Sequence, residues 1–265
     1  MDILTHVVAG ALGGAAVGLG LRGGRARVLS ALVFGAVGGA LPDLDAITRY
    51  PGFDGGLGHL LHLAPGREIY AGALWYSHHH FTHSLVAAGG ATALSAGLLG
   101  LDRVGRGPGM EGERDAAIWA LPLCLLAGFL LHLVGDLPTP ASVWGGIQLF
   151  WPSARMVGGW GWTWWFHNYD VFLVQCAGLG GVLLASLVPR HRPILARLLP
   201  MSVLALALAA STALLASREH DYAYRGHAPD YQALEDASLE QQRRSLPASW
   251  YAAMRALSEY LPVPF

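Results

Sequence analysis

Residues 116–136 read AAIWALPLCLLAGFLLHLVGD, in which the apolar run 116–134 contains His132 near its end and is followed by Asp136. A helix that spans a membrane needs about 20 apolar residues, so this stretch predicts a membrane helix with polar groups at one end. Five other stretches share its apolar character: residues 3–21, 28–41, 84–101, 171–188 and 198–217. The pattern predicts an all-α fold, a polytopic integral membrane helical bundle with about six apolar segments.

The two N-terminal segments are the weaker candidates for spans. Residues 3–21 could be a signal peptide, but such a peptide begins with basic residues, and here Asp2 follows Met1 while the arginines come after the run. We therefore expect a retained helix. Residues 28–41 give 14 residues before Pro42, or about 21 Å of helix. This segment either spans with the help of its flanks or lies half-buried against its neighbours.

Composition narrows the class of protein. Of the 265 residues, 53% are hydrophobic and 13% are charged, and the mean hydropathy is +0.40. The net charge of -1 offers no basic field, so no nucleic-acid partner is expected. Cys124 and Cys176 both lie in apolar runs, which argues against a disulfide scaffold and against a thiolate metal site. A metal would therefore take nitrogen and oxygen ligands.

Glycine recurs along the first two apolar segments. Small residues four apart let membrane helices approach closely, whereas the alternative is a composition biased toward Gly and Ala. We expect helix contacts at the following glycines: Gly10, Gly13, Gly14, Gly18, Gly35, Gly38 and Gly39.

The arginines predict an orientation, because loops rich in arginine stay in the cytoplasm. If all six segments cross, one side receives nine of them: Arg22, Arg25, Arg27, Arg103, Arg106, Arg114, Arg190, Arg192 and Arg197. The loops of the other side receive three: Arg49, Arg67 and Arg155. The N-terminus, the loops 42–83 and 135–170, and the tail are then extracytoplasmic.

The chain divides by composition into a membrane-embedded domain, residues 1–217, and an extramembrane tail, residues 218–265. The tail has apolar positions at helical spacing, which predicts one or two amphipathic helices. Such helices either lie on the membrane surface or cap the site.

Four groups of potential metal ligands lie at the ends of different apolar segments, and on this topology all of them face the outer side. They are Thr5-His6, LPDLD at 41–45, HHHFTHS at 78–84 and HLVGD at 132–136. Ionisable groups at membrane depth are costly unless they are paired, bound to metal or line a wet cavity. Because all four groups face the same side of the membrane, we expect them to form a single shared site.

Each group also has a plainer explanation. His132 and Asp136 share one face of a helix, a spacing that suits one metal or a bridge between two, but an interfacial His and a helix-ending Asp would look the same. Asp43 and Asp45 could mark a helix stop and a turn. Four imidazoles within six residues rarely have a purely structural role, so this group favours metal binding: His78, His79, His80 and His83.

The remaining histidines are less distinctive. His6 alone would suggest a satisfied polar group, and His59 and His62 are expected to be exposed. His167 and Asp170 end the run WGWTWWFHNYD at 160–170, whose tryptophans suggest an aromatic belt at the lipid headgroup level. Beside the His and Asp groups, that belt could also hold the glycerol or acyl region of a lipid.

Imidazoles and carboxylates without cysteine suit zinc, manganese or iron. Carboxylates that bridge among His ligands are typical of sites with two or more metals, which clamp a phosphoryl group and lower the pKa of bound water. Hydrolysis follows from that chemistry. A serine nucleophile would need an elbow such as GxSxG, which the chain lacks, so Ser84 is expected to orient a ligand.

The same strings, with GIQLFWPSAR at 146–155, resemble the membrane-bound metal-dependent hydrolase family of bacteria and archaea, the YdjM type. The resemblance covers roughly residues 1–175. That family is distantly similar to the zinc-dependent phospholipase C and single-strand nuclease group, all-helical enzymes with clustered zinc ions. The resemblance implies these metal-binding positions: His6, Asp43, Asp45, His78, His83, His132 and Asp136.

One position departs from the family pattern. The family usually has Arg after the first His of its third motif, where this chain has His79. The chain therefore lacks an Arg at this position that would hold a phosphate. As an alternative, His79 could itself be a metal ligand. The resemblance also implies a bacterial or archaeal cytoplasmic membrane.

We therefore expect a metal-dependent hydrolase that cleaves a phosphoester of a phospholipid or lipid-linked phosphate, with one to three divalent ions and Asp45 as the catalytic carboxylate. The residues expected to hold the metal ligands in place or to contact the substrate are His79, His80, Ser84, Thr139, His167 and Asp170. A non-catalytic metal-binding or transport protein is the alternative, and a haem protein with two axial histidines is a further one.

Overall fold

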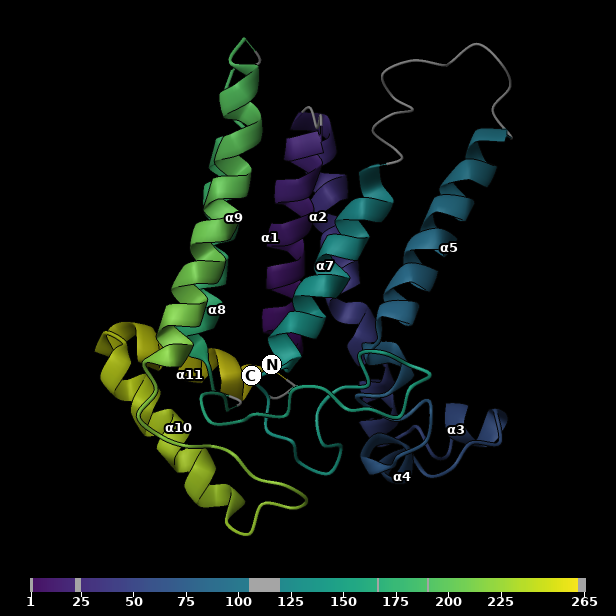
Figure 1. Ribbon diagram of the computed structural model, residues 1–265. Coiled ribbons are helices and arrows are strands. Elements are labelled where there is room, and N and C mark those ends of the chain that lie inside the picture. The colour runs from purple at the N-terminus through teal and green to yellow at the C-terminus, as the bar shows by residue number, and fades with distance from the viewer. Residues whose placement is uncertain (1, 22–24, 105–119, 166, 190, 262–265) are drawn as a thin grey trace.

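The computed structural model describes residues 2–21, 25–104, 120–165, 167–189 and 191–261, which form ten α-helices and two 3-10 helices and no β-strand (Figure 1). The long helices are α1 Ile3–Leu21, α2 Arg25–Ala40, α5 Leu85–Val104, α7 Ala120–Asp136, α8 Tyr169–Ala185 and α9 Pro193–Ala216. The shorter elements are η1 Leu41–Arg49, α3 Leu57–Leu60, α4 Gly66–Ala71, η2 Phe81–His83, α10 Tyr231–Ser245 and α11 Ala248–Tyr260. The predicted all-α fold is confirmed.

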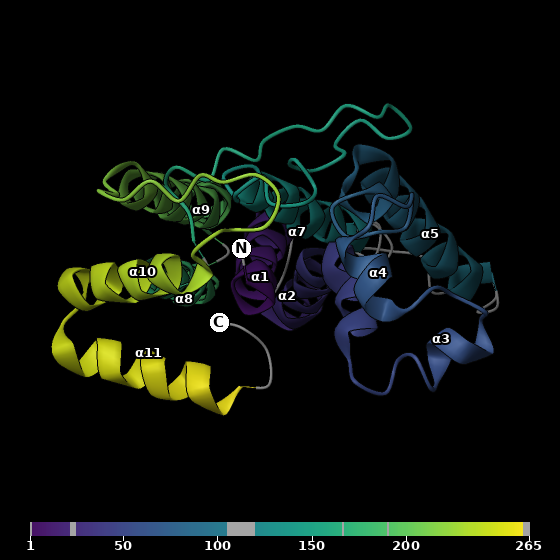
Figure 2. The same ribbon diagram turned by 90° about the horizontal axis from the view of Figure 1, so that it is seen from below.

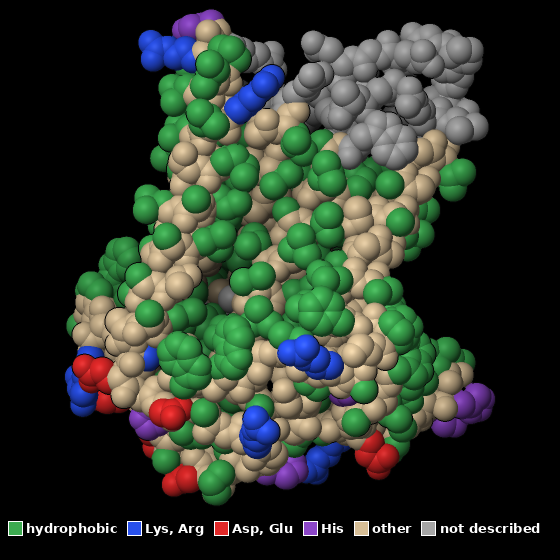
Figure 3. All heavy atoms as spheres, in the orientation of Figure 1, with side chains coloured by type: hydrophobic (Ala, Val, Ile, Leu, Met, Phe, Trp, Pro, Cys, Tyr) green, Lys and Arg blue, Asp and Glu red, His purple; other side chains and the backbone are tan. Residues whose placement is uncertain are grey.

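The six long helices stand side by side, while α3, α4, α10 and α11 gather at one end of the bundle (Figures 1 and 2). We call this the loop end; α1 begins there and α7 finishes there. On the face in Figure 3, hydrophobic side chains cover the middle of the bundle and charged side chains lie near its two ends. That distribution fits an integral membrane protein.

The lengths of the apolar helices differ from the prediction. Three segments are long and apolar enough to cross a membrane: Ile3–Leu21, Val28–Arg49 and Pro193–Ala216. The other three are shorter apolar helices: Leu85–Leu101, Ala120–Asp136 and Tyr169–Ala185. All six apolar segments are helical, but six full crossings are not confirmed.

The second segment is longer than expected because Pro42 does not stop it. The chain passes from α2 directly into η1, with Pro42 in the first turn of η1. A proline in a first turn lacks an N–H that would have no helical acceptor there, so it is compatible with a new helix. This continuation carries Asp43 and Asp45 on a helical element instead of a turn.

Glycine sets the closest contacts in the bundle, between α1, α2 and α7. A Cβ atom added at Gly35 would lie 2.2 Å from the carbonyl oxygen of Gly10, and one added at Gly128 would lie 2.0 Å from that of Gly35. A Cβ atom at Gly39 would lie 2.2 Å from the carbonyl oxygen of His6. All seven predicted glycines lie at helix contacts, so the packing prediction is confirmed.

The tail docks on the loop end of the bundle. Met254 of α11 is buried against Tyr169 and Phe172 of α8. Arg218 pairs with Asp170 through two contacts of 2.9 Å, and both side chains are nearly inaccessible to solvent. The apolar face of the tail therefore packs at least in part on protein.

The orientation in the membrane stays a prediction. Four of the counted arginines lie outside the described residues: Arg22, Arg106, Arg114 and Arg190.

Candidate metal centre

Five buried side chains meet at the loop end. His6 comes from the first turns of α1, Asp43 from η1, His83 from η2, and His132 and Asp136 from the last turns of α7. Their exposed fractions run from 0% for the three histidines to 8% for Asp43. We call these five residues the central cluster. Four separate elements supply it, so groups that are far apart in sequence lie at one place.

The ring nitrogens and carboxylate oxygens of the central cluster point at one another. His83 Nε2 lies 3.3 Å from His132 Nε2, and Asp43 Oδ1 lies 3.4 Å and 3.6 Å from these two nitrogens. Asp136 Oδ2 lies 2.9 Å from His132 Nε2 and 3.4 Å from His83 Nε2. Four ligand atoms from four side chains therefore converge.

Their spacing fits a small divalent cation. Ligand atoms about 2.0–2.1 Å from a tetrahedral zinc ion are about 3.3–3.4 Å apart, which is close to the separations seen here. The donor set of two imidazoles and two carboxylates is also one that zinc, manganese and iron accept. Uncharged hydrogen-bonding groups would be the usual solution if the site had only to fill a buried space.

Backbone contacts orient the histidines toward the cluster. His132 Nδ1 donates to the carbonyl oxygen of Gly39 at 2.7 Å, which leaves the lone pair of Nε2 directed at the cluster. His6 stacks on His132 with 3.6 Å between ring centres and directs Nε2 at Asp136 Oδ1, 3.0 Å away. The carbonyl oxygen of Gly39 thus orients His132 directly, and the stacking of His6 on His132 orients the second histidine.

A second pair extends the cluster. His78 Nδ1 donates to both oxygens of Asp45, at 3.0 Å and 3.1 Å, and lies 3.9 Å from Asp43 Oδ1. Burial lowers the pKa of His78, but the hydrogen bond and the charge of Asp45 outweigh it, so the pKa is raised overall. Asp43 therefore lies between this pair and the histidines of the central cluster. A carboxylate in that position could bridge two ions.

His79 lies beside the same site in a strained backbone conformation. Its φ is 64°, in the left-handed region, and its Nδ1 donates to the carbonyl oxygen of Gly146 at 3.1 Å. Burial, together with the positive charge of neighbouring His78 and His83, holds the pKa of His79 well below its usual value. The side chain is thus a neutral imidazole, which is the form that a metal requires.

Two other residues of the third motif make local contacts. His80 Nδ1 donates to the carbonyl oxygen of His78 at 2.9 Å. Ser84 Oγ donates to Phe81 O and accepts from the backbone N–H of Ala87, so it caps the N-terminus of α5. Both residues shape the loop that carries His78 and His83.

The remaining predicted residues separate into two groups. Thr139 lines the pocket in front of the cluster. His167 lies 3.4 Å from Glu235, and Asp170 pairs with Arg218, so both join the tail to the bundle and neither lines that pocket. His59 and His62 are exposed, as predicted.

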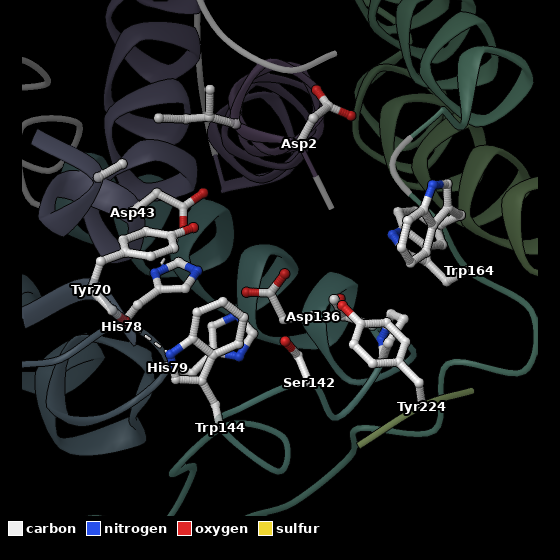
Figure 4. Close-up of a pocket in the computed structure, with 15 residues that line it drawn as sticks. Asp2, Asp43, Tyr70, His78, His79, Asp136, Ser142, Trp144, Trp164 and Tyr224 are labelled. Atoms are coloured by element: carbon white, nitrogen blue, oxygen red, sulfur yellow. Dashed lines mark hydrogen bonds and ion pairs between the residues drawn. The ribbon is translucent and has the colours of Figure 1, made fainter. Parts of the chain in front are cut away.

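The pocket in front of the cluster has a volume of about 180 Å³. Asp43, His78 and Asp136 face it (Figure 4). Asp45 binds His78 but is not among the residues that line the pocket. Tyr70 stacks on His78 with 4.5 Å between ring centres. Burial and the charge of Asp43 raise the pKa of Tyr70, so its hydroxyl stays protonated and able to donate.

Sequence reasoning missed several residues of the pocket wall: Asp2, Tyr70, Ser142, Trp144 and Tyr224. Each comes from a loop or a helix boundary and stands in no motif, so no spacing indicated it. The tryptophans of residues 160–165 divide: Trp160 and Trp162 are about half exposed, as a membrane belt requires, whereas Trp164 and Trp165 are buried and line the pocket.

A family model described as YdjM inner membrane protein matches residues 1–218. The chain belongs to this family. The YdjM match contains every residue of the central cluster and the Asp45–His78 pair, and it ends before Tyr224 and the helices α10 and α11. No curated protein and no solved structure shows a significant similarity to the chain.

Proposed function

We propose that this YdjM-family protein is a membrane-bound, metal-dependent hydrolase that cleaves a phosphoester of a phospholipid or another lipid-linked phosphate. The observation that supports it is the convergence of imidazole nitrogens and carboxylate oxygens, 2.9–3.6 Å apart, at the base of a pocket. The expected metal ligands are His6, Asp43, Asp45, His78, His83, His132 and Asp136.

A bound divalent cation would polarise a phosphoryl oxygen and lower the pKa of a water molecule, chemistry that zinc in particular supplies. The residues of the chain prepare the site for it. The carbonyl oxygen of Gly39 holds the His132 ring, and Asp136 divides its two oxygens between His6 and His132. The Tyr70 hydroxyl is a neutral donor on the pocket wall, in a site where the family's usual arginine is replaced by His79.

The Asp45–His78 pair is suited to accept a proton. His78 faces the pocket, and Asp45 binds its Nδ1, so Nε2 is the remaining nitrogen that can take a proton from an attacking water. The carboxylate then stabilises the imidazolium that forms. Asp45 therefore acts as the catalytic carboxylate through His78. If a cation occupied the group Asp43, Asp45 and His78, the same two side chains would instead be its ligands.

The alternatives fit the geometry less well. A transporter needs a polar path through the bundle. Away from the loop end, the described helices bury Gln175 and Ser211, which bond to each other at 2.7 Å, and the hydroxyl oxygen of Ser95 on α5, and these form no such path. A haem needs its two axial imidazoles on opposite faces of a porphyrin. His6 and His132 stack directly on each other, which leaves no room for a porphyrin between them.

The test combines metal analysis with lipid cleavage. Purified protein should contain at least one zinc, manganese or iron ion per chain, and it should release phosphate or headgroup from a panel of phospholipids and lipid-linked phosphates. A chelator should abolish the release, and added metal should restore it. A protein that cleaves no phosphoester with any of these metals would contradict the proposal.

His83→Ala and Asp136→Ala should each lower the metal content and abolish cleavage. His59→Ala is the matched control, because His59 is an exposed imidazole in the same loop region. Equal metal content in all three variants would refute the proposed ligand set.

A further inference from the structure

The pocket has a second end, away from the central cluster. Trp164 and Tyr224 lie on the side opposite Tyr70 and His78, with Asp136 between the two sides (Figure 4). Trp165 also lines the pocket, and both tryptophans are 2% exposed. We call Trp164, Trp165 and Tyr224 the aromatic wall.

The tail builds part of this wall. The segment after α9 is held against the loop before the tryptophans, because Gly226 N donates to Ser142 O at 2.7 Å and Ser142 N donates to Tyr224 O at 3.3 Å. Tyr222 stacks on Trp165 with 5.9 Å between ring centres. Tyr224 therefore takes a fixed place in the wall, although it lies outside the region that the family model matches.

Apart from the histidines at the end near the central cluster, the charged residues that line the pocket are acidic. No arginine or lysine is among the described residues that line it, whereas three aspartates are. Asp43 and Asp136 belong to the central cluster and would balance bound cations there. Asp2 is not a member of the cluster, although its backbone carbonyl accepts a hydrogen bond from the backbone N–H of His6 at 3.2 Å. Its side chain is buried and accepts hydrogen bonds from the backbone N–H and the hydroxyl of Thr5, at 2.8 Å and 2.7 Å.

These features together favour an organic cation. Aromatic faces attract alkylammonium groups, and the attraction grows when water is excluded, as it is from buried tryptophans. A carboxylate in the same pocket adds a Coulombic attraction that is strong at low dielectric.

We propose that the aromatic wall and Asp2 form a subsite for the alkylammonium group of the substrate, which makes a zwitterionic phospholipid headgroup the preferred substrate class. This inference rests on the proposed function. The phosphate would lie at the central cluster and the ammonium at the aromatic wall, so the two ends of the pocket match the two charges of one headgroup.

Binding of tetramethylammonium tests the subsite without catalysis. Radiolabelled tetramethylammonium should bind saturably to the metal-loaded protein in a maltoside detergent, which carries no ammonium group. Choline should displace the label at least about tenfold more effectively than 3,3-dimethylbutan-1-ol, its uncharged analogue of the same shape. Equal displacement by the two compounds would show that the wall selects shape and not charge, and would overturn the proposal.

Three variants locate the binding. Tyr224→Leu removes a ring and should weaken tetramethylammonium binding about tenfold, whereas Tyr224→Phe keeps the ring and should bind normally. Asp2→Asn should also weaken it. The control is Tyr260→Leu, because Tyr260 is a tail tyrosine that is 87% exposed. Metal content should be unchanged in all of them, and unchanged binding in Tyr224→Leu and Asp2→Asn would refute the assignment.

Competition distinguishes the source of the ammonium group. Short-chain phosphatidylcholine should displace the label, and short-chain phosphatidylglycerol, which has no ammonium, should not. Displacement by choline alone would mean that the subsite binds a free alkylammonium compound, and the headgroup assignment would fail. Ammonium binding without any phosphoester cleavage would contradict the proposed function but not the subsite, and cleavage without ammonium binding would contradict only the subsite.

Discussion

Asp43 is the residue that connects the two parts of the site. Its Oδ1 lies 3.4 Å from His83 Nε2, 3.6 Å from His132 Nε2 and 3.9 Å from His78 Nδ1, so one oxygen faces three imidazoles. A carboxylate in that position either balances several protonated histidines or binds cations that they also bind. The separations of Asp43 Oδ1 from His83 Nε2 and His132 Nε2 are close to those between two ligands of one zinc ion, which favours the second arrangement.

At the same scale, Asp45→Asn separates a catalytic role from a purely structural one. The amide keeps the size of the side chain and some hydrogen bonding but removes the charge that stabilises a protonated His78. We expect kcat for lipid cleavage to fall by about 100-fold or more, the range for losing a general base. The purified variant should retain its helices by circular dichroism and at least one metal ion by elemental analysis.

Asp236→Asn is the control for this substitution, because Asp236 is an exposed carboxylate on α10. It should leave the rate unchanged. Wild-type kcat in Asp45→Asn with metal bound would show that the charge of Asp45 is not needed for His78 to accept a proton.

The residues that could be predicted were those in dense polar strings. HHHFTHS stood out because imidazoles are rare beside apolar segments, and HLVGD because its spacing places two ligands on one helix face. Tyr70 and Tyr224 could not be predicted in this way. An isolated tyrosine has no periodic partner, and only the folded loops bring these two to opposite sides of one pocket.

At the scale of elements, α1 and α2 are held together by backbone contact. Both helices carry glycine where they cross, so neither offers side chains that could yield to an added atom. Membrane helices gain little from apolar burial against each other, since lipid is equally apolar, and close packing supplies much of the association. This contact also sets the distance between His6 on α1 and the Gly39 carbonyl that orients His132.

Gly35→Ala should therefore destabilise the bundle. Its Cβ would lie 2.2 Å from the carbonyl oxygen of Gly10, so α1 and α2 would have to separate. We expect a loss of about 1–3 kcal/mol in the free energy of unfolding, the usual cost of overpacking, and a lower melting temperature in detergent.

Gly90→Ala is the matched control on α5, where an added Cβ would meet nothing within 4 Å. It should be neutral or stabilising by up to about 1 kcal/mol, because alanine is the better helix former. Equal melting temperatures for Gly35→Ala and the wild type would mean that the contact between α1 and α2 has room for an added methyl group, and would contradict the prediction.

Element lengths were harder to predict than element types. Apolar runs identified all six long helices, but they left open whether the second one stops at Pro42, and the chain continues there into η1. A proline ends one helix and can begin another, and sequence alone does not show which follows. The difference matters to the site, because η1 carries both Asp43 and Asp45.

At the scale of the whole molecule, the bundle places its polar chemistry at one end. The short helices, the central cluster and the tail all lie at the loop end, and apolar side chains cover the middle of the face in Figure 3. Composition predicted the tail as amphipathic helices but not its place. Its docking depends on single contacts, such as Arg218 with Asp170, that no pattern encodes.

The whole-molecule prediction concerns which side of the membrane the loop end faces. The arginine count predicts that the loop end faces the extracytoplasmic side of the membrane, because arginine-rich loops are retained in the cytoplasm. In a background with Cys124→Ala and Cys176→Ala, a membrane-impermeant maleimide should label Ser153→Cys in intact cells and Arg192→Cys only after lysis. Both positions are exposed, and Arg192 begins α9 at the opposite end of the bundle. The reverse pattern would place the site in the cytoplasm, and its substrate would then come from the inner leaflet.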